Sequence, residues 1–275
     1  MRRPYSRMLK SVLSVLFAVI WAFPVLWLVL SAFKPESELF SYPLHLFPQA
    51  ATMQSFRKSI VAFDFLTYTM NSVFVAVVAT LLTLVFSSMS GFALAKYRAK
   101  WLSFFFLCLL ATTMLPTEII MSPMFTVIFG LGMYNTLWAC IIPVVGSMTG
   151  IFLMRQFFIT VPDDLLEAAR IDGANEGYIF SRIMFPLCKS QLAILAIFSF
   201  RWRWNDYIHP LISLYSKEKY TLQLALRTIS DSNSVSLDWS LLLGSSVLTM
   251  LPVLVVFIIF NRKIMSGNIS SGLKG

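Results

Sequence analysis

The sequence predicts an all-α integral membrane protein that crosses the bilayer with six helices. Hydrophobic residues make up 57% of its 275 residues and charged residues only 13%, about half the charged share of a typical soluble domain. The apolar residues gather into runs of about 20, the length that a helix needs to cross the hydrocarbon core. Because no repeat or low-complexity stretch divides the chain, we expect one membrane domain over residues 1–275.

Six apolar runs are the expected spans. They cover residues 12–32, 69–94, 102–123, 135–155, 189–209 and 241–261. The first run is longer than the apolar part of a typical signal peptide, and no A-x-A cleavage site follows it, so we expect it to remain as a span. Pro116 and Glu118 interrupt the third run, which is therefore expected to be irregular. Arg201 and Arg203 lie near the end of the fifth run, so the ends of these two spans are the least sharply defined.

Basic residues predict the orientation of these spans. Four segments hold 14 of the 22 lysine and arginine residues, namely 1–11, 95–101, 155–190 and 262–275. Short loops rich in lysine and arginine stay in the cytoplasm, so both termini are expected there, in agreement with an even number of spans. The formal net charge of +9 is therefore attributed to topology signals, and nucleic-acid binding is not predicted.

Reactive side chains show no pattern of an enzyme or a metal site. Cys108, Cys140 and Cys188 lie in or beside apolar runs without a C-x-x-C pair, which favours packing roles. His45 and His209 lie far apart in the sequence without a carboxylate cluster, and Ser-His-Asp, HExxH and GxSxG arrangements are absent. We expect a non-catalytic protein without catalytic, metal-binding or cofactor-binding residues.

The stretch GNISSGLKG imitates a phosphate-binding loop. Gly267 and Gly272 have the right spacing, but a P-loop needs Lys directly after the second glycine and then Ser or Thr. Here Leu273 intervenes and Gly275 replaces the hydroxyl residue. The chain is therefore not expected to bind ATP.

Residues 160–187, which we call the coupling region, form a polar helical stretch between the fourth and fifth runs. Pro162 suits the first turn of a helix, Asp163 and Asp164 complement the positive end of its dipole, and Gly173 can end it in a left-handed conformation. The expected apolar side of this helix consists of Leu165, Leu166, Ala169 and Ile171.

A second helix is expected after Gly173, followed by a bend at Pro186. The apolar stripe of this helix is Ile179, Phe180, Ile183, Met184 and Leu187. Acidic residues outnumber basic ones on the helix pair, with Asp163, Asp164, Glu167, Asp172 and Glu176 against Arg170 and Arg182. A helix that rests on lipid headgroups favours a basic polar face, so a docking helix for a soluble partner is the better interpretation.

The stretch EAARIDGANEGYIFSRIMFPL resembles the EAA loop of binding-protein-dependent ABC importer permeases. The pattern of that family is EAA, a glycine four residues after the second alanine, and I-x-x-P, and it falls here on Glu167, Ala168, Ala169, Gly173, Ile183 and Pro186. Four further blocks follow the family's order, namely MLPTEIIMSPMF, LGMYNTLWACIIP, WNDYIHPLI and GLKG. The fuller form P-x-x-L-x-E-A-A-x-I-D-G-A is similar to the carbohydrate branch, the maltose-type second permease family. One departure is Lys189-Ser190, where members often have Lys-Pro.

The resemblance implies the type I ABC importer permease fold, with the coupling region seated in a cleft of a separate ATPase. Glu167 and Asp172 are then expected to make polar contacts with that ATPase. Ala168, Ala169 and Gly173 are expected to supply the close fit. ATP and magnesium would be bound by the ATPase and not by this chain.

The implied complex contains a second homologous permease subunit, two copies of an ABC ATPase and an extracytoplasmic solute-binding protein. It would lie among the lipids of a bacterial or archaeal cytoplasmic (inner) membrane. The outer segments 33–68 and 213–240 are too short for a solute-capturing domain, and 213–240 is the candidate contact surface for the binding protein. The terminal GLKG either reaches toward the ATPases or is a frayed end.

Three residues are candidates for the translocation pathway: Glu118, Asn205 and Asp206. Glu118 either faces the pathway or lies at the outer water boundary. Asn205 and Asp206 line the outer half of the pathway, or they lie in headgroup water beside an aromatic belt. The residues of that belt are Trp202, Trp204 and Tyr207.

The expected solute is a sugar or oligosaccharide, and a polyol or a sugar phosphate is the alternative. An integral membrane enzyme is a further alternative, which requires an acid–base or metal cluster at one membrane depth. A structural scaffold would also use a docking helix, but it would not need Glu118 or a proline-broken span.

Overall fold

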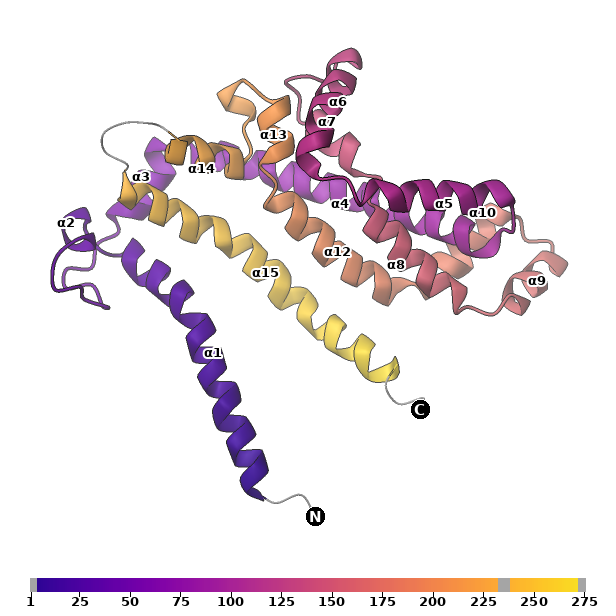
Figure 1. Cartoon of the computed structure of the whole chain (residues 1–275), viewed down its shortest axis with the longest axis horizontal. Coiled ribbons are helices and arrows are strands. Elements are labelled where there is room, and N and C mark those ends of the chain that lie inside the picture. Colours follow the sequence, from indigo (N-terminus) through magenta and orange to yellow (C-terminus); the bar gives the residue numbers. More distant parts are fainter. Residues whose placement is uncertain (1–3, 232–237, 272–275) are drawn as a thin grey trace. The chain divides into compact units, whose positions relative to one another are not determined.

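A computed structural model describes residues 4–231 and 238–271. Every regular element in these ranges is a helix (Figure 1), which confirms the all-α fold class. In chain order the helices are α1 Pro4–Ala32, α2 Glu36–Leu39, α3 Gln54–Ala62, α4 Phe65–Lys96, α5 Lys100–Thr112, α6 Thr117–Gly130, α7 Trp138–Ile141, η1 Ile142–Val144, α8 Met148–Ile159, α9 Asp164–Ile171, α10 Glu176–Tyr178, η2 Ile179–Met184, α11 Phe185–Leu187, α12 Lys189–Trp204, α13 Ile208–Ser213, η3 Lys217–Lys219, α14 Leu222–Asp231 and α15 Trp239–Ser271.

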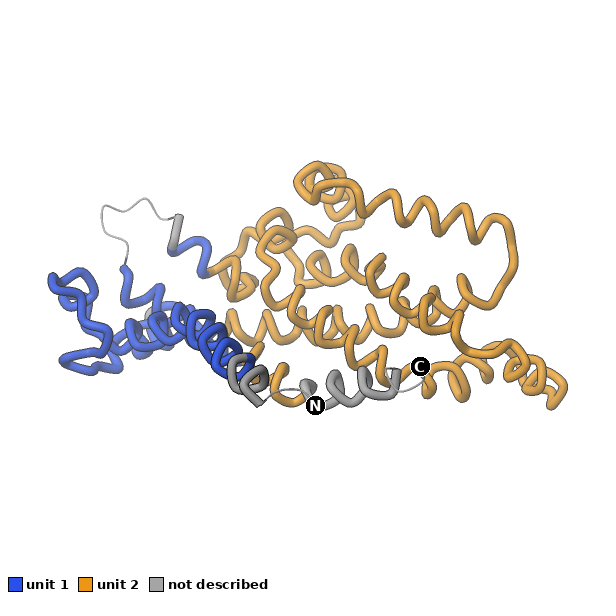
Figure 2. The backbone as a smooth tube through the Cα atoms, turned by 60° about the horizontal axis from the view of Figure 1, so that its bottom comes forward, with its two compact units in different colours: residues 1–66, 226–251 blue, residues 67–225, 252–275 orange. Residues whose placement is uncertain are grey.

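The chain divides into two compact units (Figure 2). Unit 1 contains residues 1–66 and 226–251, and unit 2 contains residues 67–225 and 252–275. The helices α4, α14 and α15 each contribute residues to both units. The expectation of a single membrane domain stays a prediction.

Three helices in the described part of the chain are long and apolar enough to cross a membrane by themselves: α1, α4 and α15. Three further candidates are pairs of helices joined at a bend, and six spans result if each pair counts as one. The bends measure 112° between α5 and α6, 40° between α7–η1 and α8, and 77° between α10–α11 and α12. The six apolar runs therefore correspond to six helical stretches, of which only half are uninterrupted.

The third run differs most from the expected span 102–123. The helix α5 ends at Thr112, and Pro116 stands before the first residue of α6. Proline lacks the N–H that would continue the ladder, and it disfavours helical geometry at Leu115 before it. The expected irregularity at Pro116 is confirmed, and the third run is a pair of helices joined at a bend.

The ends of the other helices also differ from the apolar runs. The fourth stretch begins at Trp138 and continues to Ile159, beyond the predicted range 135–155. The fifth ends at Trp204, short of the predicted residue 209. The second and sixth continue past their apolar runs, because hydropathy marks the apolar part of a helix and not its polar ends.

In unit 1, α3 contacts the beginning of α15 through hydroxyl and ionic groups. Ser245 Oγ donates to Ser59 Oγ at 3.0 Å, and both residues are fully buried. Lys58 Nζ lies 2.9 Å from Asp238 Oδ2. The buried hydroxyls thus satisfy one another, which avoids most of the cost of removing them from water.

In unit 2, most of the buried residues of α4 are small, namely Ser72, Ala76, Ala79, Thr80, Thr83, Ser87, Ser88 and Gly91. The closest approach is at Gly91, where an added Cβ would lie 2.6 Å from Met154 Cβ and 2.8 Å from Arg155 N on α8. Only glycine leaves room for the two helices at this point. Small residues of this kind let membrane helices pack at short distance.

Two apolar clusters lie along α4. One surrounds Val75 and Ala79 and joins α4 to α7, η1 and α14. The other surrounds Phe92 and joins α4 to α8, α9, η2 and α12. The coupling region therefore packs directly against the C-terminal part of α4, although the two are far apart in the sequence.

Candidate functional site

The helix α9 carries the EAA residues and has defined ends. It begins after Asp163, with Asp164 and Glu167 in its first turn, where acidic groups favour the helix dipole. Pro162 lies just outside the helix and not in its first turn. Gly173 has φ +83°, and its N–H donates to Arg170 O at 3.0 Å. The predicted left-handed glycine stop is therefore confirmed.

The buried side of α9 is narrower than the sequence predicts. Leu166 and Ala169 are buried, but Leu165 is exposed and Ile171 keeps 86% of its surface exposed. Ile171 follows Leu166 by five residues, which is about 140° around an α-helix, so it cannot share the buried side. The predicted four-residue apolar side is wrong for Leu165 and Ile171, and α9 presents an apolar side chain to its surroundings.

The predicted second helix is present but not regular. Asn175 Oδ1 accepts a bond from Tyr178 N at 2.8 Å at its start. The middle part, η2, is a π-helix, in which residues five apart lie on one side. Ile179 and Met184 are accordingly fully buried, whereas Leu187 is about half exposed, so its place in the stripe is wrong. The bend expected beside Pro186 is confirmed by the 77° turn into α12.

Charged side chains hold the coupling region to the end of α4. Lys96 Nζ lies 2.6 Å from Asp163 Oδ1 and also donates to Val161 O. The Tyr97 hydroxyl donates to Glu176 Oε2, and Arg170 Nε donates to Glu176 Oε1 at 2.8 Å.

These contacts shift the proton affinities of the groups involved. The hydrogen bond from Lys96 lowers the pKa of Asp163. Arg170 first, and then Tyr97, lower the pKa of Glu176. Burial, and then Glu176, raise the pKa of Tyr97. Each carboxylate is therefore held in its charged form by a donor from another part of the chain.

Two hollows flank α9. The first, of about 410 Å³, is lined by Ala169, Asp172, Gly173, Ala174, Asn175, Tyr178 and Ile183. The second, of about 390 Å³, is lined by Lys96, Tyr97, Arg98, Asp163, Leu166, Glu167 and Arg170.

Five of the seven predicted coupling residues line these hollows, namely Glu167, Ala169, Asp172, Gly173 and Ile183, whereas Ala168 and Pro186 line neither. Glu167, Ala168, Asp172 and Gly173 are exposed, and Pro186 is half-buried. Ala169 is buried in the apolar cluster around Phe92 and also lines the first hollow.

Sequence reasoning missed Lys96 and Tyr97. Both lie in the cation-rich loop after the second run, which was interpreted only as a topology signal. A tyrosine beside a lysine gives no local pattern, since their partners Asp163 and Glu176 lie 67 and 79 residues further along the chain. Only the packing of α4 on the coupling region brings these groups together.

The candidate pathway residues have mainly local contacts. Asp206 Oδ1 accepts bonds from Ile208 N and His209 N, and its Oδ2 lies 2.6 Å from His209 Nδ1. Asn205 Nδ2 donates to Arg201 O at 2.9 Å. Glu118 lies exposed in the first turn of α6, and both of its alternatives stay predictions.

The predicted aromatic belt is only partly present on the surface. Trp204 is 1% exposed and stacks on Phe200 with ring centroids 5.8 Å apart, so its assignment to a lipid-facing belt is wrong. Packing in α12 overrides the usual interfacial preference of tryptophan. Trp202 and Tyr207 are partly exposed, as a belt requires.

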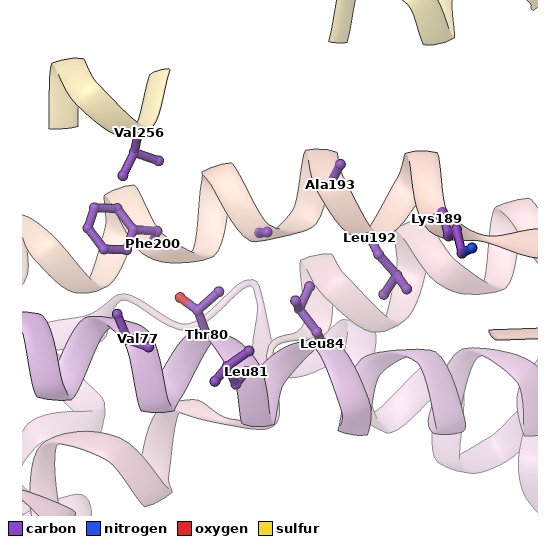
Figure 3. A pocket seen from close by; sticks show the side chains of 10 residues that line it. Val77, Thr80, Leu81, Leu84, Lys189, Leu192, Ala193, Phe200 and Val256 are labelled. Carbon is purple, nitrogen blue, oxygen red and sulfur yellow. The ribbon is translucent and has the colours of Figure 1, made fainter. Parts of the chain in front are cut away.

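An apolar groove of about 530 Å³ lies between α4 and α12 (Figure 3). Thr80 and Lys189 are its polar lining residues, and the Thr80 side chain points from α4 toward α12. None of Glu118, Asn205 and Asp206 lines this groove. The groove and the candidate pathway residues are thus separate features of unit 2.

Other predicted features lie elsewhere or outside the described residues. Within the described ranges, no three His, Cys, Asp or Glu residues are grouped as metal ligands. Cys140 and Cys188 are buried, in agreement with packing roles, whereas Cys108 is exposed. The GLKG stretch and part of the segment 213–240 lie outside the described residues.

Known proteins match the chain over most of its length. The family model described as "Binding-protein-dependent transport system inner membrane component" matches residues 49–262. The arabinooligosaccharides transport system permease protein AraQ of Halalkalibacterium halodurans is 37% identical, with 100% of both chains covered. The sn-glycerol-3-phosphate transport system permease protein UgpE of Brucella abortus is 30% identical, with 97% of both covered.

A solved structure has the same fold. It is a chain in the crystal structure of a bacterial ABC transporter involved in the import of the acidic polysaccharide alginate. The TM-score is 0.83 at 22% identity, and the match covers 95% of this chain and 98% of that one.

Proposed function

We propose a function from one premise: this chain belongs to the family of binding-protein-dependent transport system inner membrane components. It is a permease of the ABC importer class with the type I fold, as its resemblance to that family predicts. As the solute we propose a sugar or oligosaccharide, supported by 37% identity to an arabinooligosaccharide permease over the full length of both chains.

The proposed role of α9 is to dock onto a separate ATPase. The observation that carries this role is an EAA helix whose Glu167, Ala168 and Ile171 face outward while Leu166 anchors it in the core. A helix held in this way can be displaced by a partner only together with the elements beneath it. Binding energy that differs between two states of the ATPase can therefore shift the permease between two states.

The proposed complex has the composition expected for the family. A second permease supplies the other half of the pathway, two ATPase copies bind ATP and magnesium, and a solute-binding protein delivers the solute from outside. This chain itself is non-catalytic and holds no cofactor. Both of its termini and the coupling region lie in the cytoplasm, in keeping with the basic loops.

Co-purification tests this proposal. The chain is extracted from its own membrane in mild detergent, and its stoichiometric partners are identified by mass spectrometry. We expect an ABC ATPase and a second permease. Isolation of the chain without an ATPase, even after crosslinking through an Ala168→Cys variant, would contradict the docking role of α9.

Two variants on one helix then test the docking surface. Glu167→Gln is expected to weaken ATPase binding at least about fivefold, a typical size for coupled sites. Asp164→Asn is the matched control, because Asp164 is exposed on the same helix and shares with Glu167 the first-turn position that favours the helix dipole, but has no proposed contact with the ATPase. Equal losses for both variants would assign the effect to the helix dipole and not to a docking contact.

The solute is tested by uptake into proteoliposomes that contain the purified complex. Arabinooligosaccharides are expected to be taken up in an ATP-dependent manner. Uptake of sn-glycerol 3-phosphate instead would favour the second candidate, to which the 30% identical relative points. A free polyol is not favoured, because these relatives are named for an oligosaccharide and a phosphate ester.

A further inference from the structure

Lys96, at the end of α4, is a charged side chain in a buried position. Only 4% of its side chain is exposed, and removing an ammonium group from water is costly unless it is paired. The Lys96 ammonium is paired twice, with Val161 O after α8 and with Asp163 Oδ1 at the start of α9. One cation therefore joins the end of α4 to the segment between α8 and α9, where the coupling region begins.

Tyr97 makes the corresponding connection to the middle of the coupling region. Its hydroxyl donates to Glu176 at the start of α10, and the same carboxylate accepts a bond from Arg170 of α9. The Tyr97 ring packs edge-on against Phe92 of α4, with centroids 5.8 Å apart. Glu176 thus holds α9, α10 and the end of α4 together.

The end of α4 is in turn fixed to the membrane helices of unit 2. Gly91 allows the backbone of α8 to come close, and Arg155 Nε donates to Leu94 O at 3.4 Å. Phe92 contacts Phe158 of α8, with ring centroids 5.8 Å apart. A displacement of the coupling region therefore reaches α4 through side chains, without passing along the covalent chain.

We propose that Lys96 and Tyr97 are positioning residues that make the end of α4 and the coupling region move as one body. This inference rests on the proposed function, and it adds a second path by which motion of the ATPase reaches the spans. In addition to α8 and α12, which are joined to the coupling region by the chain itself, the span α4 is carried along by these two side chains. Neither residue needs to touch the ATPase or the solute.

The first test removes one contact at a time in the full complex reconstituted in liposomes. Tyr97→Phe keeps the ring against Phe92 and loses the bond to Glu176. It is expected to raise the ATP hydrolysed per arabinooligosaccharide taken up by at least about fivefold, while the ATPase stays bound. Glu176→Gln keeps an acceptor for Tyr97 and is expected to couple better than Glu176→Ala.

The matched control is Tyr42→Phe, because Tyr42 is 96% exposed and belongs to unit 1. The complex with Tyr42→Phe is expected to hydrolyse as much ATP per solute taken up as the complex with the unmodified chain. A normal ATP-to-solute ratio in Tyr97→Phe would overturn the positioning role. Loss of the ATPase from the wild-type complex would instead contradict the proposed function, so the two failures are distinguishable.

A crosslink tests the single-body motion directly. Tyr97→Cys and Glu176→Cys are combined with Cys108→Ser, which removes the exposed native thiol, and are joined with a short bifunctional thiol reagent. The joined protein is expected to regain the ATP hydrolysis and uptake that the unjoined double variant loses. Inhibition by the crosslink, reversed when the linker is cleaved, would show that the two parts separate during transport and would overturn the inference.

Discussion

The two ends of α4 are held by different kinds of contact. Its C-terminal end, the carboxylate end, is held through Asp163 and Glu176, which bind Lys96 and Tyr97. Its N-terminal part contains Asn71. We call the region around the side-chain contacts of Asn71 and Asn135 the amide end of unit 2. Asn71 Nδ2 donates to the backbone oxygens of residues 218 and 220.

Asn135 completes the amide end. Its Nδ2 donates to Ser216 Oγ at 2.9 Å, and its Oδ1 accepts from Ser216 N at 3.2 Å. No side-chain carboxylate takes part in these contacts of Asn71 and Asn135. The difference teaches that the neutral amide of Asn71 holds one end of α4 to the backbone of residues 218 and 220, whereas the end beside the coupling region is held by carboxylates.

The largest effect is expected from overpacking behind the carboxylate end. In Gly91→Ala the new Cβ meets Met154 Cβ and Arg155 N at less than 3 Å. Overpacking of about 3 kcal/mol outweighs a gain of about 1 kcal/mol in helix propensity, which leaves a net loss of about 2 kcal/mol. Denaturant titration in mixed micelles measures this loss in the free energy of unfolding.

The control for this variant is Gly130→Ala in α6, where nothing lies within 4 Å of an added Cβ. Its unfolding free energy is expected to change by less than about 0.5 kcal/mol. Equal effects of the two substitutions would show that α4 and α8 have room to move apart.

A smaller loss is expected at the amide end. Asn135 has φ +57°, a conformation that asparagine tolerates better than alanine. Asn135→Ala is expected to lose about 1.5 kcal/mol of stability, from its hydrogen bonds and from strain together. Asn135→Gly removes the side chain without the strain and should lose less, and both losses should be the same at high and low salt. If the stability losses of these two variants depended strongly on salt, the amide end would also depend on charge and the proposed difference between the two ends would be wrong.

Two glycines allow the amide end and the coupling region to be compared by substitutions that cost the same stability. Gly132 near the amide end and Gly173 in the coupling region have φ +67° and +83°, and neither has an atom within 4 Å of an added Cβ. Substitution of either by alanine is expected to cost about 1 kcal/mol of stability. Only Gly173→Ala should also raise the ATP hydrolysed per solute, and an equal change in Gly132→Ala would remove the special role of the coupling region.

The smallest effect is expected from pH. The pKa values of Asp163 and Glu176 lie below their ordinary values of 3.8 and 4.5. The unfolded state therefore binds more protons in that range, so these contacts stabilise the fold above the ordinary values and weaken as the pH falls through the lowered ones.

A spin label tests this pH dependence. A label on an Ala168→Cys variant should become more mobile below about pH 4, while a label near Asn71 should not change. Equal mobilisation of both labels would indicate general acid unfolding.

The sequence predicts the features of unit 2 that depend on local chemistry. Gly173 ends α9 because its neighbours require a left-handed residue, and Pro116 breaks the third run because it lacks an N–H. These requirements are set within a few residues. The fold class follows in the same way from apolar runs of spanning length.

Features that depend on tertiary packing are not predictable from one sequence. The bond between Tyr97 and Glu176 joins residues 79 positions apart, and the burial of Trp204 depends on which side of α12 meets its neighbours. The 112° bend between α5 and α6 has a predictable position but not a predictable size. Hydropathy reports how apolar a segment is, and not which neighbour covers it.

The π-helix η2 has a consequence for how the coupling region is oriented. In α9, a spacing of five residues places Leu166 inside and Ile171 outside, whereas in η2 the same spacing places Ile179 and Met184 both inside. A π-helix has more residues per turn than an α-helix, so each residue of η2 rotates the backbone by a smaller angle before α12 begins. The outward side of α9 and the inward side of η2 are thus set independently, because a glycine stop separates the two helices and η2 has the wider turn.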